Sequence, residues 1–163
     1  MKKIAILGST GSIGASLIKI IKENKKDFLI ELLTANKDYK KIINQAIFFK
    51  VKNIIINDKK SYLIAKKILK NKDINIHNNF NSFQKIFKNK KIDYTMSAIS
   101  GFEGLEPTLD IIKFTKTIAI ANKESIICGW NLIKKKLNKY NTKFIPIDSE
   151  HFSIWSLIGD AKN

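Results

Sequence analysis

Ala5-Ile6-Leu7-Gly8-Ser9-Thr10-Gly11-Ser12-Ile13-Gly14, residues 5–14, is the most informative segment of this chain. An apolar run ends at Gly8, and glycine recurs at Gly11 and Gly14. Glycine lets the backbone turn tightly and approach a ligand, and the free N–H groups that start a following helix attract negative charge. The stretch therefore predicts a strand, a turn that binds a pyrophosphate, and a helix. The alternative is a glycine-rich turn that binds no ligand.

The residues after this turn have the spacing of an amphipathic helix. Apolar side chains fall at i, i+4, i+7 and i+8, at Ile13, Leu17, Ile20 and Ile21. We expect a helix over residues 12–25 with this stripe facing the core. Strand, turn and helix then form the first unit of an α/β fold.

Short apolar runs alternate with helical stretches along the rest of the chain. This alternation predicts a Rossmann-like, doubly wound α/β fold with a mostly parallel sheet. A further helix is expected where Asn57 or Asp58 precedes an apolar stripe made of Ile64, Ala65, Ile68 and Leu69. Strands are expected at residues 3–7, 28–34, 53–56, 74–76, 93–99, 117–121 and 143–147, and the remaining helices at 39–49, 82–87, 105–113, 130–139 and 152–158.

Length and composition limit the classes of protein to which the chain can belong. With 163 residues, 44% of them apolar, it has room for one domain with a real core and for the start of a second. The apolar runs are too short to cross a bilayer, and Met1 lies too close to the first strand for a signal peptide. The single cysteine, Cys128, excludes an intramolecular disulfide. We therefore expect a cytoplasmic protein without a membrane partner.

The formal charge of +16 is unusual for a chain of this size. It would attract anionic ligands, and it is also compatible with nucleic acid. However, the lysines are spread along the whole chain and accompany a heavy use of Ile and Asn, which indicates a compositional bias at surface positions. Because no aromatic residues are interleaved with basic ones as a base-stacking platform, we expect no nucleic-acid partner.

The residues after the second expected strand indicate which dinucleotide is bound. An NAD-binding fold usually has an acidic residue there for the ribose 2′-hydroxyl, whereas an NADP-binding fold has a cation for the 2′-phosphate. Residues 34–38 read Thr-Ala-Asn-Lys-Asp, and Lys37 is the first charged residue. The sequence therefore favours NADP, with the side chain of Asp38 turned away from the phosphate. The alternative is that Lys37 is one more solvated lysine.

Two short polar segments carry candidate chemistry in the second half of the chain. Residues 122–125, Asn-Lys-Glu-Ser, follow an apolar strand at the sheet edge where ligands collect. They suit a polar substrate site, and they suit equally a helix start with Asn122 as the cap and Glu124 in the first turn. Cys128 is expected to be a small buried hydrophobe, and Trp130 a packing residue.

The second polar segment is Pro-Ile-Asp-Ser-Glu-His at residues 146–151. Asp148 and Glu150 project to the same side of an extended backbone, where two carboxylates repel unless they share a proton or a cation. Oxygen ligands of this kind suit Mg²⁺ or Mn²⁺. The alternative is an exposed acidic turn.

The three segments together, GSTGSIG at 8–14, NKES at 122–125 and PIDSEH at 146–151, closely resemble the 1-deoxy-D-xylulose 5-phosphate reductoisomerase family. The resemblance runs over almost the whole chain. It implies an enzyme that uses NADPH and Mg²⁺ or Mn²⁺ to convert the sugar phosphate 1-deoxy-D-xylulose 5-phosphate into 2-C-methyl-D-erythritol 4-phosphate. This reaction is the committed step of the non-mevalonate isoprenoid route.

The resemblance also implies roles for individual residues. Lys123 and Ser149 would contact substrate, and Asp148 and Glu150 would bind the metal, with Glu150 touching substrate as well. Of these, Lys123, Asp148 and Glu150 would be catalytic. The residues that would contact NADPH are Gly8, Thr10, Gly11, Ser12, Ile13, Asn36, Lys37, Asn122 and Glu124.

The chain departs from the family pattern in two ways. The family has glycine and asparagine where this chain has Asn36 and Asp38, and its members continue well beyond residue 163 into parts that complete the active site and most of the homodimer contact. We expect residues 1–121 to form the NADPH-binding domain and residues 122–163 to begin the catalytic domain. The alternatives are a nucleotide-binding remnant without catalysis, and an NADP-linked dehydrogenase of the semialdehyde type with Cys128 as nucleophile.

Overall fold

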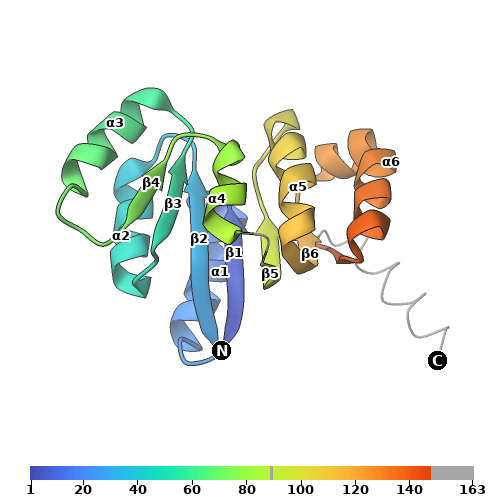
Figure 1. Cartoon of the computed structure of the whole chain (residues 1–163), viewed down its shortest axis with the longest axis horizontal. Helices are drawn as coiled ribbons and strands as arrows, with labels where there is room; N and C mark the ends of the chain where they lie inside the picture. The colour runs from blue at the N-terminus through green and yellow to red at the C-terminus, as the bar shows by residue number, and fades with distance from the viewer. Residues whose placement is uncertain (89, 148–163) are drawn as a thin grey trace.

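The computed structural model of the chain describes residues 1–88 and 90–147. Within these residues one sheet of seven strands runs through the molecule, in the order β4-β3-β2-β1-β5-β6-β7 (Figure 1). Its strands are β1 (Lys2–Leu7), β2 (Phe28–Ala35), β3 (Asn53–Ile56), β4 (Asn75–His77), β5 (Ile92–Ser97), β6 (Thr115–Ile120) and β7 (Lys143–Pro146).

All six strand pairings are parallel. The chain builds outward from β1 through β2, β3 and β4, and it then returns to the other side of β1 with β5. In a doubly wound sheet, the point where the strand order reverses is where ligands bind, at the carboxyl ends of the strands. Here that point lies between β1 and β5, which confirms the Rossmann-like fold expected from the sequence.

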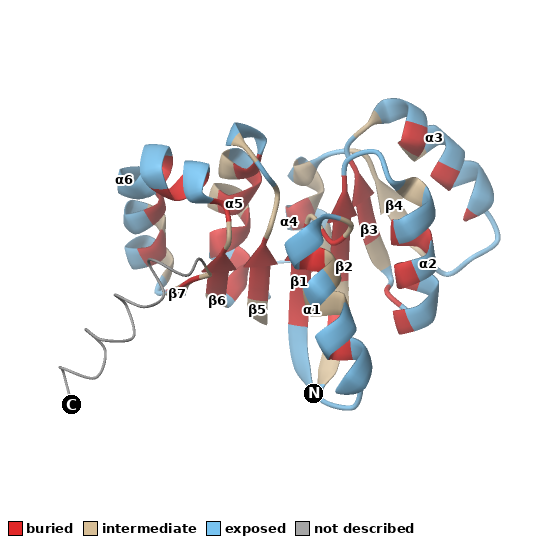
Figure 2. Cartoon of the chain, turned by 180° about the vertical axis from the view of Figure 1, so that it is seen from behind, coloured by how far each residue is buried: buried red, intermediate tan, exposed pale blue. Residues whose placement is uncertain are grey.

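Helices connect the strands and cover both faces of the sheet. They are α1 (Ser12–Glu23), α2 (Tyr39–Phe49), α3 (Lys59–Ile68), α4 (Phe83–Phe87), α5 (Leu105–Ile111) and α6 (Lys123–Tyr140), with short 3₁₀ turns η1 (Phe80–Ser82), η2 (Phe102–Gly104) and η3 (Ile112–Phe114). Figures 1 and 2, taken from opposite sides, show α4 and α5 in front of one face and α1 in front of the other.

The alternation of side chains along β1 divides the core between these two faces. Ile4 and Ile6 join a buried cluster with residues of α1, α2 and α3, whereas Ala5 and Leu7 join a second cluster with residues of α4, α5 and α6. The strands are therefore buried on both sides, as expected of a parallel sheet (Figure 2).

The predicted apolar stripes of two helices are partly wrong. In α1, Ile13 and Ile20 are exposed, at 40% and 55%, while Ile21 is buried. In α3, Ile64 and Ile68 are exposed in the same way, and the buried positions are Ser61, Ala65 and, just after the helix, Leu69. Because isoleucine is common on the surface of this chain, apolar spacing alone counts too many positions as core.

The last described helix begins earlier than the range 130–139 expected from apolar spacing, at the alternative start that the sequence offered at Asn122. α6 starts at Lys123, seven residues before the expected start at residue 130, because Asn122 caps it. It packs against α5, and β7 then adds to the same sheet beside β6. Among the described residues, none of the helices combines the length and apolar character that crossing a membrane requires.

Candidate functional site

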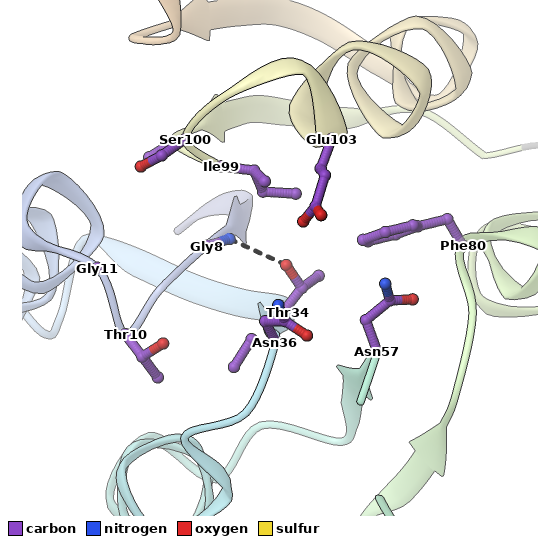
Figure 3. Close-up of a pocket in the computed structure, with 12 residues that line it drawn as sticks. Gly8, Thr10, Gly11, Thr34, Asn36, Asn57, Phe80, Ile99, Ser100 and Glu103 are labelled. Atoms are coloured by element: carbon purple, nitrogen blue, oxygen red, sulfur yellow. Dashed lines mark hydrogen bonds between the residues drawn. The ribbon is translucent and has the colours of Figure 1, made fainter. Parts of the chain in front are cut away.

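A cleft of about 240 Å³ opens at the carboxyl ends of the central strands (Figure 3). Its walls come from the turn after β1, the end of β2, the residue after β3, and the segment after β5. Because all these strands are parallel, segments far apart in the sequence meet here. The lining residues are Gly8, Thr10, Gly11, Thr34, Ala35, Asn36, Asn57, Phe80, Ala98, Ile99, Ser100 and Glu103.

The three glycines of the first turn differ in whether the fold has room for a side chain at their positions. Gly8 has a φ of +79°, and a Cβ there would lie 2.6 Å from the carbonyl oxygen of Ala98. A Cβ at Gly14 would lie 2.3 Å from the carbonyl oxygen of Gly8. At Gly11 a Cβ would meet only that same oxygen, at an ordinary 3.6 Å. The fold therefore requires Gly8 and Gly14 but leaves room at Gly11, on the wall of the cleft.

A buried hydrogen-bond network fixes the shape of this turn. The backbone N–H of Gly8 donates to the Oγ1 of Thr34 at 2.9 Å, and that of Ser9 donates to the carbonyl oxygen of Thr34 at 2.9 Å. The Ser9 hydroxyl donates to the Oε1 of Gln45 at 2.8 Å, and the Gln45 amide donates back to the Ser9 carbonyl at 3.1 Å. β2 and α2 thus hold the turn in place.

A lysine that the sequence did not single out also contacts the turn. Lys41, on the first turn of α2, donates from Nζ to the carbonyl oxygen of Thr10 at 2.7 Å. Its ammonium therefore lies beside the glycine-rich turn and adds positive charge to that of the α1 N-terminus. This arrangement favours an anionic group in the cleft.

Two acidic residues close to Lys37, its neighbour Asp38 and also Asp58, are engaged in helix caps. Asp38 accepts a hydrogen bond from the backbone N–H of Lys41 at 2.9 Å, so its carboxylate caps α2. Asp58 caps α3 by accepting from the N–H of Ser61 at 2.8 Å. The pKa of Asp58 is lowered, mainly by its hydrogen bonds with Ser61 and less by the charge of Lys37. The Lys37 side chain is exposed and follows Asn36 on the wall of the cleft, but Lys37 is not itself among the lining residues.

A second cleft, also of about 240 Å³, shares the segment after β5 with the first. Its other walls are Ile13, at the start of α1, and the residues that join β6 to α6. The exposure of Ile13 therefore has a local cause, since the side chain lines a cleft and not the core. The lining residues are Ile13, Ala98, Ile99, Ser100, Ala121, Asn122, Lys123 and Glu124.

Asn122 holds two walls of this second cleft together. Its Oδ1 accepts from the backbone N–H of Ser125 at 2.8 Å, which caps α6. Its amide nitrogen donates to the carbonyl oxygen of Ile99 and, at 2.6 Å, to that of Gly101. The helix start that the sequence offered as one alternative for residues 122–125 is therefore present, and it also lines the cleft. Lys123 and Glu124 follow on the exposed side of the helix.

The other residues singled out in the second half of the chain are described by the structure only in part. Asp148, Ser149 and Glu150 lie outside the described residues. Within residues 1–88 and 90–147, no group of three or more His, Cys, Asp or Glu residues is placed to hold a metal ion. Cys128 is exposed on α6, so the expectation that it is buried is wrong. Trp130 contacts Phe144, with 5.3 Å between the ring centroids, but it is 37% exposed, so the expected packing role holds for only part of its side chain.

Sequence reasoning missed several residues of the first cleft. Gln45 and Lys41 stand in an ordinary helical pattern, and only the fold shows that they reach the glycine-rich turn. Phe80 and Glu103 lie in the short 3₁₀ turns η1 and η2, which follow β4 and β5. No spacing rule links them to the turn, because their meeting depends on the sheet order.

Comparison with known families gives one clear match. A family model described as 1-deoxy-D-xylulose 5-phosphate reductoisomerase matches residues 4–129. The relative of that name from Pelagibacter ubique is 69% identical over 163 residues, which is 99% of this chain and 42% of the relative. The one from Buchnera aphidicola is 41% identical over 97% of this chain and 40% of its own length. The chain thus spans about two fifths of the length of these curated relatives.

Solved structures agree with the sequence comparison. A Zymomonas mobilis 1-deoxy-D-xylulose 5-phosphate reductoisomerase in complex with NADPH has a TM-score of 0.84 and 32% identity over 92% of this chain and 39% of that one. A DOX-P reductoisomerase in complex with NADPH, fosmidomycin and magnesium has a TM-score of 0.84 and 31% identity over 93% and 37%. An S. aureus homoserine dehydrogenase, at 19% identity and a TM-score of 0.53 over 89% and 32%, shares the fold alone.

Proposed function

The chain belongs to the 1-deoxy-D-xylulose 5-phosphate reductoisomerase family, and from this premise we propose that its first cleft binds NADPH. One observation carries the proposal most directly. Gly11 lines the cleft, yet the fold has room for a side chain there. A glycine that packing does not require is explained by a ligand that approaches the backbone closely, as a pyrophosphate does at such a turn.

The cofactor would lie across the turn and the end of β2. In this proposal the N–H groups of Thr10, Ser12 and Ile13 hold the pyrophosphate at the start of α1, next to Gly8. The N–H of Gly11 already donates to the Gly8 carbonyl oxygen at 3.2 Å, and the part of Gly11 is to let the pyrophosphate approach the backbone closely. Asn36 and Lys37 would hold the ribose 2′-phosphate. The capping roles of Asp38 and Asp58 support this assignment, because both carboxylates already accept hydrogen bonds from helix N-termini.

The second cleft would take the nicotinamide half and the substrate. It continues from the first through Ala98–Ser100, which is the direction that a dinucleotide follows from its pyrophosphate. We assign Asn122 and Glu124 to NADPH and Lys123 to the substrate. The hydrogen bonds of Asn122 to the segment after β5 would keep the two walls at a fixed separation.

For the whole family reaction we propose the NADPH- and divalent-metal-dependent rearrangement and reduction of 1-deoxy-D-xylulose 5-phosphate to 2-C-methyl-D-erythritol 4-phosphate. NADPH supplies the hydride, and the protein supplies binding and orientation. Residues 1–121 would hold the cofactor, and residues 122–163 would begin the catalytic part. There Lys123 would stabilise negative charge on the substrate, Ser149 would bind the substrate, and Asp148 and Glu150 would hold Mg²⁺ or Mn²⁺.

Titration of the 163-residue chain with NADPH and with NADH tests the cofactor assignment. We expect NADPH to bind at least about tenfold more tightly, since a lysine paired with a phosphate contributes more than one facing a hydroxyl. Lys37→Ala should remove most of this preference, and Lys134→Ala, which removes an exposed lysine of α6, should keep it. Equal affinity of the unaltered chain for the two cofactors would contradict the assignment.

Turnover with 1-deoxy-D-xylulose 5-phosphate, NADPH and Mn²⁺ or Mg²⁺ tests the reaction itself. The oxidation of NADPH is followed at the absorbance of the reduced nicotinamide, with substrate omitted as a control. Activity that depends on substrate and metal supports the proposal. NADPH binding without turnover identifies this chain as a nucleotide-binding unit only.

A further inference from the structure

The first cleft extends beyond the parts assigned to the pyrophosphate and the ribose. At the end opposite to Thr10 and Gly11, Figure 3 shows Phe80 and Glu103 pointing into the same space, with Asn57 below them. Phe80 comes from η1 after β4, and Glu103 comes from η2 after β5. Neither residue has a role in the phosphate contacts proposed above.

The Phe80 ring is held firmly enough to serve as a wall. Its centroid lies 5.6 Å from that of Phe83, which is 1% exposed and belongs to the core cluster under α4 and α5. Phe80 itself is only partly buried, and its side chain lines the cleft. One side of the ring is therefore anchored by the core while the ring also borders an open space. This is the arrangement of an aromatic residue that stacks on a planar ligand.

Glu103 is a carboxylate in a cleft that otherwise favours anions. It follows Gly101, which has a φ of +72°, and it precedes Gly104, where a Cβ would lie 2.5 Å from the carbonyl oxygen of Ile99. The backbone that carries Glu103 is thus packed tightly on the end of β5. A carboxylate fixed near a negatively charged cofactor is unfavourable unless it accepts hydrogen bonds from the ligand. A neutral base with an amino group provides such a donor.

We propose that Phe80 and Glu103 form the purine subsite of the cleft and select a 6-aminopurine. Phe80 stacks on the base, and a carboxylate oxygen of Glu103 accepts a hydrogen bond from the exocyclic amino group of adenine. The subsite rests on the proposed binding of NADPH, because it lies beyond the end of β2, where the adenosine ribose would be. A 6-oxo purine would instead present a carbonyl oxygen to the carboxylate, and two acceptors repel.

The test compares NADPH with its hypoxanthine analogue, in which an oxygen replaces the 6-amino group. Both are titrated into the 163-residue chain, and binding is followed by the fluorescence of the reduced nicotinamide. We expect NADPH to bind about tenfold more tightly, since a hydrogen bond to a charged group is lost in the analogue. Glu103→Gln should reduce this preference to about twofold or less, because the Gln amide is both a donor and an acceptor.

Glu106→Gln is the matched control. Glu106 is an exposed carboxylate in the first turn of α5, it does not line the cleft, and its loss changes the net charge by the same amount. This variant should keep the full preference for NADPH. A preference that falls equally in both variants would overturn the role of Glu103, because it would show an effect of net charge.

Phe80→Leu tests the stacking wall separately. It should weaken the binding of NADPH and of the analogue by the same factor, about tenfold, because stacking does not depend on the 6-substituent. Unchanged affinity in Phe80→Leu, or equal binding of both cofactors by the unaltered chain, overturns the purine subsite alone. No binding of NADPH by the unaltered chain overturns the proposed function and this subsite with it.

Discussion

Ser9 and Gln45 are joined by two reciprocal hydrogen bonds, from the Ser9 hydroxyl to the Gln45 Oε1 at 2.8 Å and from the Gln45 Nε2 to the Ser9 carbonyl at 3.1 Å. Both residues are buried, at 0% and 8% exposure. The pair ties the glycine-rich turn to the middle of α2, so α2 positions the turn as well as covering the sheet.

Gln45→Leu should therefore destabilise the fold and loosen the turn. It leaves the buried Ser9 carbonyl without this partner, which costs about 1–3 kcal/mol in the free energy of unfolding. We expect lower affinity for NADPH as well, since the turn would no longer be held rigidly. Urea unfolding and NADPH titration measure the two effects. Asn44→Leu, at an exposed neighbouring position, is the control and should change neither.

Substitution of two glycines of the turn should affect two different properties, the stability of the fold at Gly14 and the affinity for NADPH at Gly11. Gly14→Ala places a Cβ against backbone atoms at 2.3 and 2.7 Å, so we expect a loss of about 2–3 kcal/mol in thermal or urea unfolding. Gly11→Ala has room in the fold and should leave stability unchanged, but it should weaken NADPH binding about tenfold or more by blocking close approach of the pyrophosphate. If Gly11→Ala binds NADPH normally, the turn does not hold the pyrophosphate.

Asn122 should be required for stability as a cap and as a link between segments. Asn122→Ala removes the acceptor for Ser125 and the donor to Gly101, and we expect the free energy of unfolding to fall by about 2 kcal/mol. Asn122→Asp keeps the cap but turns an oxygen toward carbonyl oxygens, so it should not restore stability. Full stability of Asn122→Asp would show that the cap alone matters. Asn138→Ala, at an exposed site on α6, is the control.

His77 should make the fold sensitive to mild acid. Its Nε2 is buried and has no hydrogen-bond partner among the residues that the structure describes. Burial, and to a lesser extent the charge of Lys85, lowers the pKa of His77. Since the unfolded chain binds the proton more readily, this contribution to stability is complete above the unfolded pKa of about 6.5 and is lost as the pH falls toward the folded pKa.

Unfolding measured between about pH 7 and pH 5 should therefore show a loss of stability in the unaltered chain that is absent in His77→Gln. The pKa values of Asp58 and Asp93 are also lowered in the folded chain, so these two carboxylates also stabilise the fold less as the pH falls. Their contribution to stability is lost only below about pH 4, the ordinary pKa of an aspartate. An identical pH dependence in both proteins would show that His77 is protonated equally well in the folded state.

Most of the elements could be predicted from the sequence because local patterns determine them. The strands β1, β2, β3 and β6 each end in three or four consecutive buried residues, most of them apolar, and the sequence places these strands within two residues of the observed ends. α2 is predicted from Tyr39 to Phe49 and observed with the same limits. Prediction was weaker for α6, because its first turn is polar and begins with a cap, so apolar periodicity starts only later.

The candidate site could be predicted only in part. The turn at Gly8–Gly14 and the position of Lys37 follow from spacing along the chain, and the structure brings Gly8, Gly11 and Asn36 to the same cleft. The purine end of that cleft could not be predicted, because Phe80 and Glu103 come from separate segments that only the strand order brings together. The sequence also did not predict which isoleucines are buried, since Ile20 and Ile64 were expected in the core and are exposed.

The α/β class and the glycine-rich turn could be read from the sequence, because each depends on residues that are close together in the chain. The family could be read as well, since the motifs at residues 8–14, 122–125 and 146–151 are recognised by their residue types and their order along the chain. The side chains that contact the turn could be found only from the folded chain: they are Gln45 and Lys41 from α2 and Thr34 from β2. The reason is physical: backbone conformation follows local sterics and spacing, whereas a cleft forms between parallel strands whose order in the sheet differs from their order in the chain.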